Sequence, residues 1–220
     1  MSGMDAREAV LARVRDALSR SQDGPPAPVP RTYRTGSGIA PGTAEAIDLL
    51  IDRLVDYRAQ VHRCAAGDLA SALGDLAADA SSVVVPSGLD PGWRDAVADR
   101  AEILTDTAGA PLDNTTLDGA GAVLTAARVA IAESGTIVLD AQPDQGRRAI
   151  SLVPDRHICV LRAKQIVATV PEAVAILGEH PQRPLTWIAG PSATSDIELV
   201  RVEGVHGPRT LDVVIAGGRD

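Results

Sequence analysis

Hydrophobic and polar positions alternate between helical and strand-like spacing from residue 43 onward. Apolar residues three and four positions apart predict helices over 43–58 and 67–79, and short runs rich in Val, Ile and Leu predict strands over 59–64, 81–86 and 101–106. A brief helix is predicted near Trp93. Strands that alternate with helices of this length require crossover connections, so they favour a largely parallel sheet covered on both faces.

The second half of the chain has shorter connections. Strands are predicted at GAVLTA, GTIVLDA, HICVLRA, TWIAG and LDVVIAG, and a helix at TVPEAVAILGEH, which begins at Thr169 or Val170 before a proline. Joints this short are typical of hairpins, so antiparallel strands are expected as well. The prediction is a mixed, mostly parallel sheet.

The N-terminal region is set apart by its pattern. Residues 5–19 carry apolar side chains at helical spacing with charges on the other face, and the following residues, to about 42, are dense in Pro and Gly and cannot continue a helix or a sheet. We therefore expect a helix and arm over 1–42 and one α/β domain over 43–220. The amphipathic helix is expected to pack on the domain or on a second copy of the chain.

Charge and composition exclude some functions. The net charge is −8 without a basic cluster, which disfavours nucleic acids and anionic membranes as partners. We expect a cytoplasmic protein, because no apolar run is long enough for a membrane helix and the first residues are charged. The only two cysteines, Cys64 and Cys159, fall short of the four thiolates that an iron-sulfur cluster normally takes, so no cofactor of that kind is expected on this chain.

The stretch AIAESGTIVLD places Glu133 between an apolar run and a Ser-Gly-Thr turn. A carboxylate at a strand end can meet a ligand while the backbone N–H groups of the turn point the same way. A turn with a solvated glutamate explains the pattern equally simply.

A second candidate is DQGRRAISLVPDRHICV, which carries Arg147, Arg148 and His157. Paired guanidinium groups can clamp a carboxylate or phosphate, although adjacent charges often form only a solvated surface. His157 begins a strand and is either a structural or a catalytic histidine; a ligand that contacts an ordinary imidazole would bind differently between about pH 6 and 7.

The third candidate is GPSATSDIELVRVEGVHGP, residues 190–208. Its glycines and prolines suit a connector, and Ser195 with Glu198 matches a capping box that starts a helical turn. A helix start can also hold an anion. Ser192, Asp196 and His206 have the residue types of a hydrolytic triad, but no nucleophile elbow frames the serine.

Metal and nucleotide patterns are weak. His62 and Cys64 repeat the H-x-C spacing of His157 and Cys159, but alternating strand positions do not match the knuckles of structural zinc sites. Neither a dinucleotide fingerprint nor a phosphate loop is present, so no metal site or bound cofactor is predicted.

In combination, AIAESGTIVL, RRAISLVPDRHICVL and the 190–208 stretch resemble the lactate-utilization C family, which shares the LUD domain. The resemblance covers roughly residues 40–217. It implies a three-layer α/β/α fold similar to the sugar-phosphate isomerase and CoA-transferase superfamily. It also implies a role in bacterial oxidation of L-lactate to pyruvate together with iron-sulfur partner proteins.

The motifs of this family carry over by residue. The residues that match the family's motifs give the catalytic candidates Glu133, His157 and His206 and the ligand-binding candidates Ser134, Gly135, Thr136, Gly190, Ser192, Thr194, Asp196 and Gly207. The paired guanidinium groups add Arg147 and Arg148 as ligand-binding candidates. We expect these residues to form one pocket for a small organic acid or another small anion. Iron-sulfur clusters are expected in partner proteins rather than on this chain.

Two enzymatic alternatives stay open beside a substrate-binding or accessory subunit. In the related CoA-transferases a similar Glu-x-Gly element supplies a carboxylate nucleophile, so Glu133 could transfer an acyl or CoA group. An ATP-dependent cyclo-ligase is less well supported, because the chain has one lysine and no phosphate loop.

Overall fold

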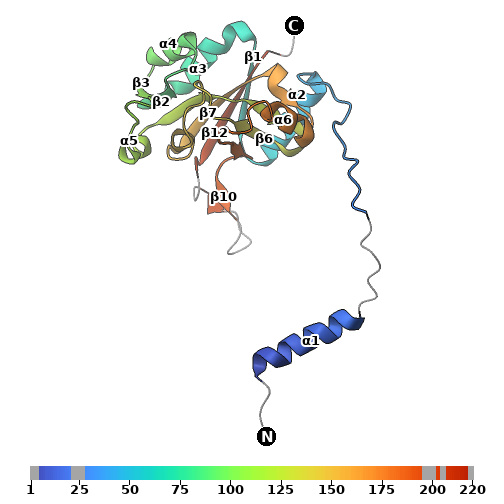
Figure 1. The fold of residues 1–220 in the computed structure, drawn as a ribbon. Coiled ribbons are helices and arrows are strands. Elements are labelled where there is room, and N and C mark those ends of the chain that lie inside the picture. The colour runs from blue at the N-terminus through green and yellow to red at the C-terminus, as the bar shows by residue number, and fades with distance from the viewer. Residues whose placement is uncertain (1–4, 21–27, 195–201, 204–206, 218–220) are drawn as a thin grey trace. The chain divides into compact units, whose positions relative to one another are not determined.

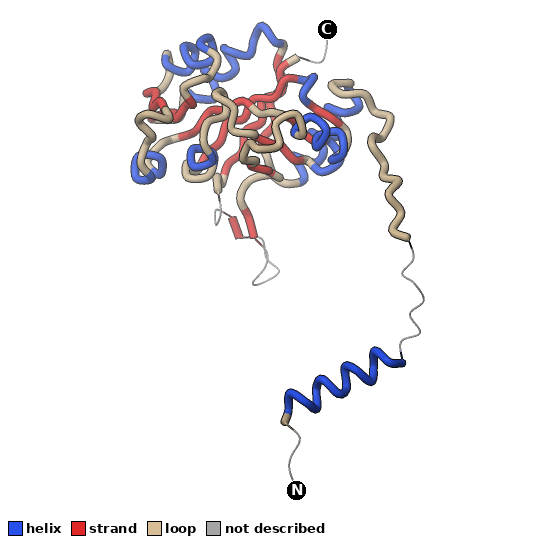
Figure 2. The backbone as a smooth tube through the Cα atoms, viewed as in Figure 1, coloured by secondary structure: helices blue, strands red, loops and turns tan. Residues whose placement is uncertain are grey.

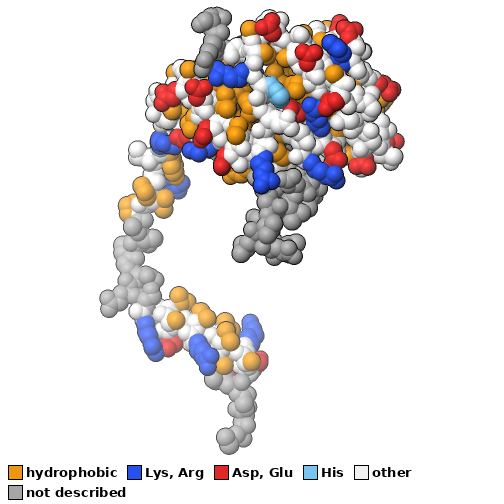
Figure 3. All heavy atoms as spheres, turned by 180° about the vertical axis from the view of Figure 1, so that it is seen from behind, with side chains coloured by type: hydrophobic (Ala, Val, Ile, Leu, Met, Phe, Trp, Pro, Cys, Tyr) orange, Lys and Arg blue, Asp and Glu red, His pale blue; other side chains and the backbone are white. Residues whose placement is uncertain are grey.

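The computed structural model describes residues 5–20, 28–194, 202–203 and 207–217 (Figures 1 and 2). Contacts divide the chain into a small unit, Met1–Tyr33, and a large unit, Arg34–Asp220. The small unit contains the predicted helix, α1 (Ala6–Arg20), none of whose residues is buried. Figure 3 shows hydrophobic side chains along α1, where Val10, Val14 and Leu18 are exposed. Their role in oligomerisation stays a prediction.

The large unit is built on a six-stranded sheet in which every neighbouring pair is parallel. The strands, in spatial order, are β1 (Gln60–Cys64), β12 (Thr210–Ala216), β7 (Arg156–Arg162), β4 (Ala122–Ala126), β2 (Ser82–Pro86) and β3 (Glu102–Asp106). Three of them, β2, β4 and β12, are buried over almost their whole length, which explains their continuous apolar sequences.

Helices α3 (Leu69–Ala77) and α4 (Pro91–Ala98) cover one face of this sheet with an aliphatic core. The other face packs on α2 (Ala44–Asp56), whose Ala46, Ile47, Leu50 and Leu54 form a buried stripe at helical spacing. The α2 helix begins where the sequence predicts, because the Thr43 hydroxyl accepts a hydrogen bond from the Ala46 N–H at 3.4 Å. The short helix α5 (Asn114–Asp118), which the sequence did not predict, packs near β2 and β4 through Leu117.

A second, four-stranded sheet packs beside α2. Its order is β8 (Ile166–Val167), β5 (Val129–Ile131), β6 (Thr136–Leu139) and β9 (Thr186–Ile188), with antiparallel pairs on both sides of β6. Helix α6 (Val170–Leu177) covers its outer face. The three-layer α/β/α class is therefore confirmed, but the antiparallel strands form a sheet of their own instead of extending the central one.

Candidate functional site

A cavity of about 270 Å³ opens at the amino ends of β7 and β12. Four segments form it: the 3-10 turn η3 (Arg148–Ser151), the start of β7, the chain from β9 to Ser192, and the chain that leads into β12. Its lining consists of Arg148, Ser151, Leu152, His157, Thr186, Trp187, Ile188, Ala189, Gly190, Pro191, Ser192, Gly207, Pro208 and Leu211. Five of the predicted site residues meet here: Arg148, His157, Gly190, Ser192 and Gly207.

His157 is the buried polar group of this cavity, with 1% of its surface exposed. Its Nε2 lies 2.8 Å from the Thr125 hydroxyl of β4, whereas its Nδ1 has no hydrogen-bond partner among the described residues. Burial lowers the pKa of His157 to about 4 and outweighs the opposing charge of Asp212. The imidazole is therefore neutral at pH 6 to 7, and the titration expected there from an ordinary histidine does not apply to it.

The two adjacent arginines have different roles, so they do not form a clamp. Arg147 binds Asp106 at the end of β3, with Nε and Nη2 at 3.0 and 2.9 Å from the carboxylate oxygens. Arg148 lines the cavity and has no ion-pair partner within the described part of the chain. A guanidinium and a neutral imidazole that line the same cavity favour a small anion that also carries a hydrogen-bonding group.

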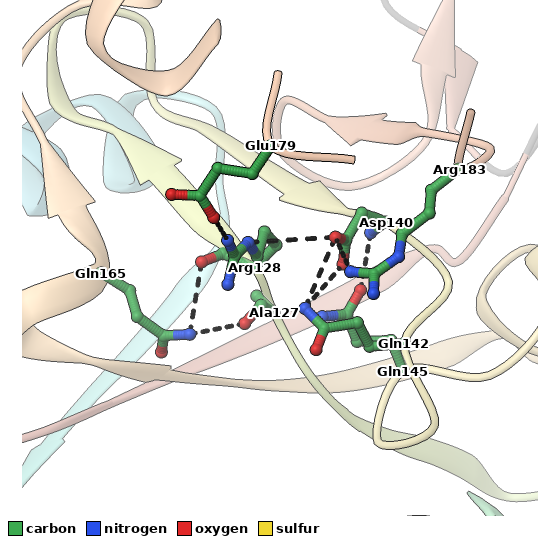
Figure 4. Close-up of polar contacts among 8 residues, drawn as sticks. All are labelled: Ala127, Arg128, Asp140, Gln142, Gln145, Gln165, Glu179 and Arg183. Carbon is green, nitrogen blue, oxygen red and sulfur yellow. Dashed lines mark hydrogen bonds and ion pairs between the residues drawn. The ribbon is translucent and has the colours of Figure 1, made fainter. Parts of the chain in front are cut away.

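The segment before Arg147 is held by a buried polar cluster. Figure 4 shows Asp140, which is 2% exposed at the end of β6, accepting hydrogen bonds from Arg183 at 3.0 Å and from Gln142 at 3.1 Å. The backbone N–H of Asp140 donates to Gln145 at 2.6 Å. This cluster fixes the loop over residues 140–147, so η3 and its Arg148 start from a rigid position.

The structure describes residues 190–194, 202–203 and 207–208 of the stretch 190–208. Gly190 has a left-handed φ of +79°, and a Cβ at this position would lie 2.7 Å from the Cβ of Tyr57, so only glycine fits against the end of α2. The Ser192 N–H donates to the Pro208 carbonyl at 2.8 Å, and the short strands β10 (Ala193–Thr194) and β11 (Val202–Glu203) pair antiparallel beyond it. Thr194 lies in β10, whereas Asp196, His206 and the predicted capping box lie outside the described residues.

The Glu133 turn forms but does not line the cavity. Glu133, Ser134, Gly135 and Thr136 lie in and after the 3-10 turn η2 (Ala132–Ser134), where Gly135 has a left-handed φ of +64°. The Glu133 carboxylate faces Arg34, whose Nη2 is 2.9 Å from Oε2. The N–H groups of Glu133 and Gly135 donate to Ala168 and Ala132, so these two donors serve the fold.

The two H-x-C pairs lie on opposite faces of the central sheet. Cys159 belongs to the core under α2 and Cys64 packs against the core under α3 and α4. His62 instead binds the fully buried Asp212, with Nε2 2.8 Å from Oδ1, and Arg156 binds the other oxygen of Asp212 at 2.8 Å. In the described part of the chain, no three His, Cys, Asp or Glu side chains are grouped so that they could hold a metal ion.

Sequence reasoning missed several residues of the cavity. Trp187, Leu152 and Leu211 form much of its apolar wall, and Thr125 positions His157 from a different strand. One signal was available for Trp187, because it is one of two tryptophans in a chain with no Phe and is 45% exposed. Thr125 carries no local signal, since its contact with His157 depends on the pairing of β4 with β7.

The fold and this cavity together define a three-layer α/β/α protein with a cationic cavity of small-molecule size at the amino edge of its parallel sheet. None of the helices in the described ranges is long and apolar enough to span a bilayer. The chain belongs to the LUD domain family, whose model matches residues 47–216.

Individual relatives agree with this assignment. A Deinococcus radiodurans protein named lactate utilization protein C is 45% identical over 220 residues, which cover 98% of both chains. A Geobacillus kaustophilus protein of the same name is 33% identical over 97 residues, 41% of this chain and 40% of that one. The crystal structure of a DUF162 family protein from Deinococcus radiodurans covers 79% of this chain and 98% of its own, with a TM-score of 0.67 and 41% identity.

Proposed function

We propose that this protein takes part in lactate utilization as a substrate-binding or accessory subunit. We also propose that the cavity lined by Arg148 and His157 binds lactate, a small 2-hydroxy acid. The names of its relatives support the process, since the Deinococcus radiodurans protein matches nearly the whole chain. The observation that carries the site is that Arg148, which forms no ion pair with a described residue, lines the same cavity as His157, whose buried Nδ1 has no described hydrogen-bond partner.

The chemistry of a 2-hydroxy acid matches these groups. Its carboxylate suits the Arg148 guanidinium, which can donate two parallel hydrogen bonds. Its hydroxyl group both donates and accepts, so it suits the Nδ1 of a neutral imidazole in either tautomer. Binding relieves an unsatisfied buried nitrogen, which gives the ligand a favourable contribution beyond charge attraction.

We further propose that the redox centres of the reaction reside in iron-sulfur partner proteins. The chain has two cysteines, half the number that a cluster normally takes. Burial raises the pKa of Cys159 to about 12, so its sulfur stays a protonated thiol and is a poor metal ligand or nucleophile. Purification of the tagged chain from cells grown on lactate tests this: recovery with iron-sulfur proteins is expected, and recovery of the chain alone contradicts it.

Ligand binding is tested by titrating the protein with L-lactate and reading the fluorescence of Trp187, which lines the cavity. A Trp93→Phe background makes Trp187 the only tryptophan. Arg148→Ala is expected to weaken binding at least about tenfold, whereas Arg94→Ala, an exposed position on α4, leaves it unchanged. Equal affinity in the Arg148 variant, or no saturable signal with lactate or pyruvate, refutes the proposed site.

A further inference from the structure

A second cavity, of about 320 Å³, lies at the opposite, carboxyl edge of the central sheet. It opens where β7 and β12 end and where α3 begins, and it shares no residue with the first cavity. Its lining consists of Ala66, Leu69, Trp93, Arg162, Ala163, Lys164 and Ala216. In α/β proteins with parallel strands, ligands commonly bind outside the carboxyl ends.

The floor of this cavity is apolar and well packed. Leu69, Trp93 and Ala216 are each less than a tenth exposed and belong to the core beneath α3 and α4. These side chains are held by the core, so they offer a preformed apolar surface. Such a surface with a few polar groups at its rim is the usual construction of a small-molecule site.

The rim of the cavity is cationic. The Arg162 guanidinium lies over the Trp93 ring at 5.3 Å, and Lys164 follows two residues later. Both side chains are exposed, and neither forms an ion pair with any described residue, although the charge of Arg162 acts on the carboxyl of Asp144, whose pKa burial raises and Arg162 lowers. Lys164 is also the only lysine of the protein. Two cations that form no ion pair in the described part of the chain thus lie at the rim of one cavity.

We propose that this cavity binds a phosphate monoester with an apolar or aromatic body, with the phosphate on Arg162 and Lys164 and the body on the floor formed by Leu69, Trp93 and Ala216. A phosphate monoester carries nearly two negative charges at neutral pH, which match the two cations. A carboxylate would neutralise only one of them. The inference is independent of the proposed lactate site, which lies at the other edge of the sheet.

The two tryptophans separate the two sites, because Trp187 lines the first cavity and Trp93 the second. In a Trp187→Phe background, Trp93 alone reports on the carboxyl-edge cavity. We use AMP as the probe, with inorganic phosphate and adenosine as its separate parts. AMP is expected to change the Trp93 emission saturably, at least about tenfold more tightly than either part alone.

The charge requirement is tested with Arg162→Ala/Lys164→Ala, which is expected to weaken AMP binding at least about tenfold. The matched control, Arg7→Ala/Arg15→Ala, removes two exposed arginines from α1 and is expected to leave it unchanged. No saturable response to AMP, equal affinity in the Arg162/Lys164 variant, or adenosine binding as tightly as AMP overturns the proposal. A response of Trp187 alone to AMP also overturns it, since the ligand would then occupy the other cavity.

Discussion

The buried histidine of the first cavity makes the stability of the protein depend on pH in a defined window. His157 has a pKa of about 4 in the folded protein, against an ordinary value of 6.5. Between these values the unfolded chain binds a proton that the folded protein does not bind, so the folded state loses stability as the pH falls from 6.5 toward 4. Above pH 6.5 the contribution is fully present.

The size of the effect follows from the two pKa values. The full difference corresponds to about 3 kcal/mol, of which about 2 kcal/mol is lost by about pH 5. Other groups also titrate in this range, so a comparison with a variant is needed. In His157→Gln a neutral amide replaces the imidazole and can still bond to the Thr125 hydroxyl.

The assay is urea unfolding at about pH 7.5 and about pH 5.0. Wild type is expected to lose about 2 kcal/mol more than His157→Gln between the two conditions. The surface variant Arg94→Ala is expected to keep the pH dependence of wild type. If wild type and His157→Gln lose the same free energy of unfolding, the imidazole is not the buried neutral group described above, and its place in the lactate proposal fails as well.

Four further substitutions test the roles assigned to other residues. Arg147→Ala leaves the buried Asp106 carboxylate without its guanidinium and is expected to destabilise the protein by about 3 kcal/mol. Arg148→Ala is expected to change the free energy of unfolding by less than about 0.5 kcal/mol. Urea unfolding of both variants checks this contrast. Gly190→Ala, which forces a Cβ against Tyr57 at a left-handed φ, is expected to lower the free energy of unfolding by about 2 kcal/mol in the same assay. Incubation with acetyl-CoA is expected to give no covalent adduct by intact mass in wild type or Glu133→Gln, and an adduct on wild type alone would instead support acyl transfer by Glu133.

The fold was largely predictable because its main elements carry strong local patterns. The stripe of α2 and the apolar runs of β2, β4 and β12 each specify an element and its buried face. The second sheet was not predictable in the same way. Its strands β5 and β8 have three and two residues, too few for a period, and their pairing joins segments more than thirty residues apart.

The site was predictable in its segments but not in its partners. Arg147 and Arg148 are adjacent and chemically identical, and only the position of Asp106, 41 residues before Arg147, decides which of them is held in an ion pair. Likewise, the glutamate of the ESGT turn was found from sequence, whereas its contact with Arg34, 99 residues away, could not be. Contacts of this range depend on how elements far apart in the sequence pack together, which no local pattern specifies.

The strand order also explains why the two cavities lie where they do. The strands β2 and β4 are neighbours in the central sheet, but the next central strand in the chain lies on opposite sides of them: β3 beside β2, and β7 beside β4. At such a reversal of strand order, α/β proteins usually bind a ligand outside the carboxyl ends of the two strands. Here the loop over residues 140–147 occupies that position: the Gly88 N–H donates to Pro143 and the Ala126 N–H donates to Asp144, both at 3.0 Å. A Cβ on Gly88 would lie 2.4 Å from Pro143, which shows how closely the loop approaches. Because the chain itself satisfies these two donors, a ligand gains nothing from them, and the two proposed sites rely instead on Arg148 with His157 at one edge and on Arg162 with Lys164 at the other.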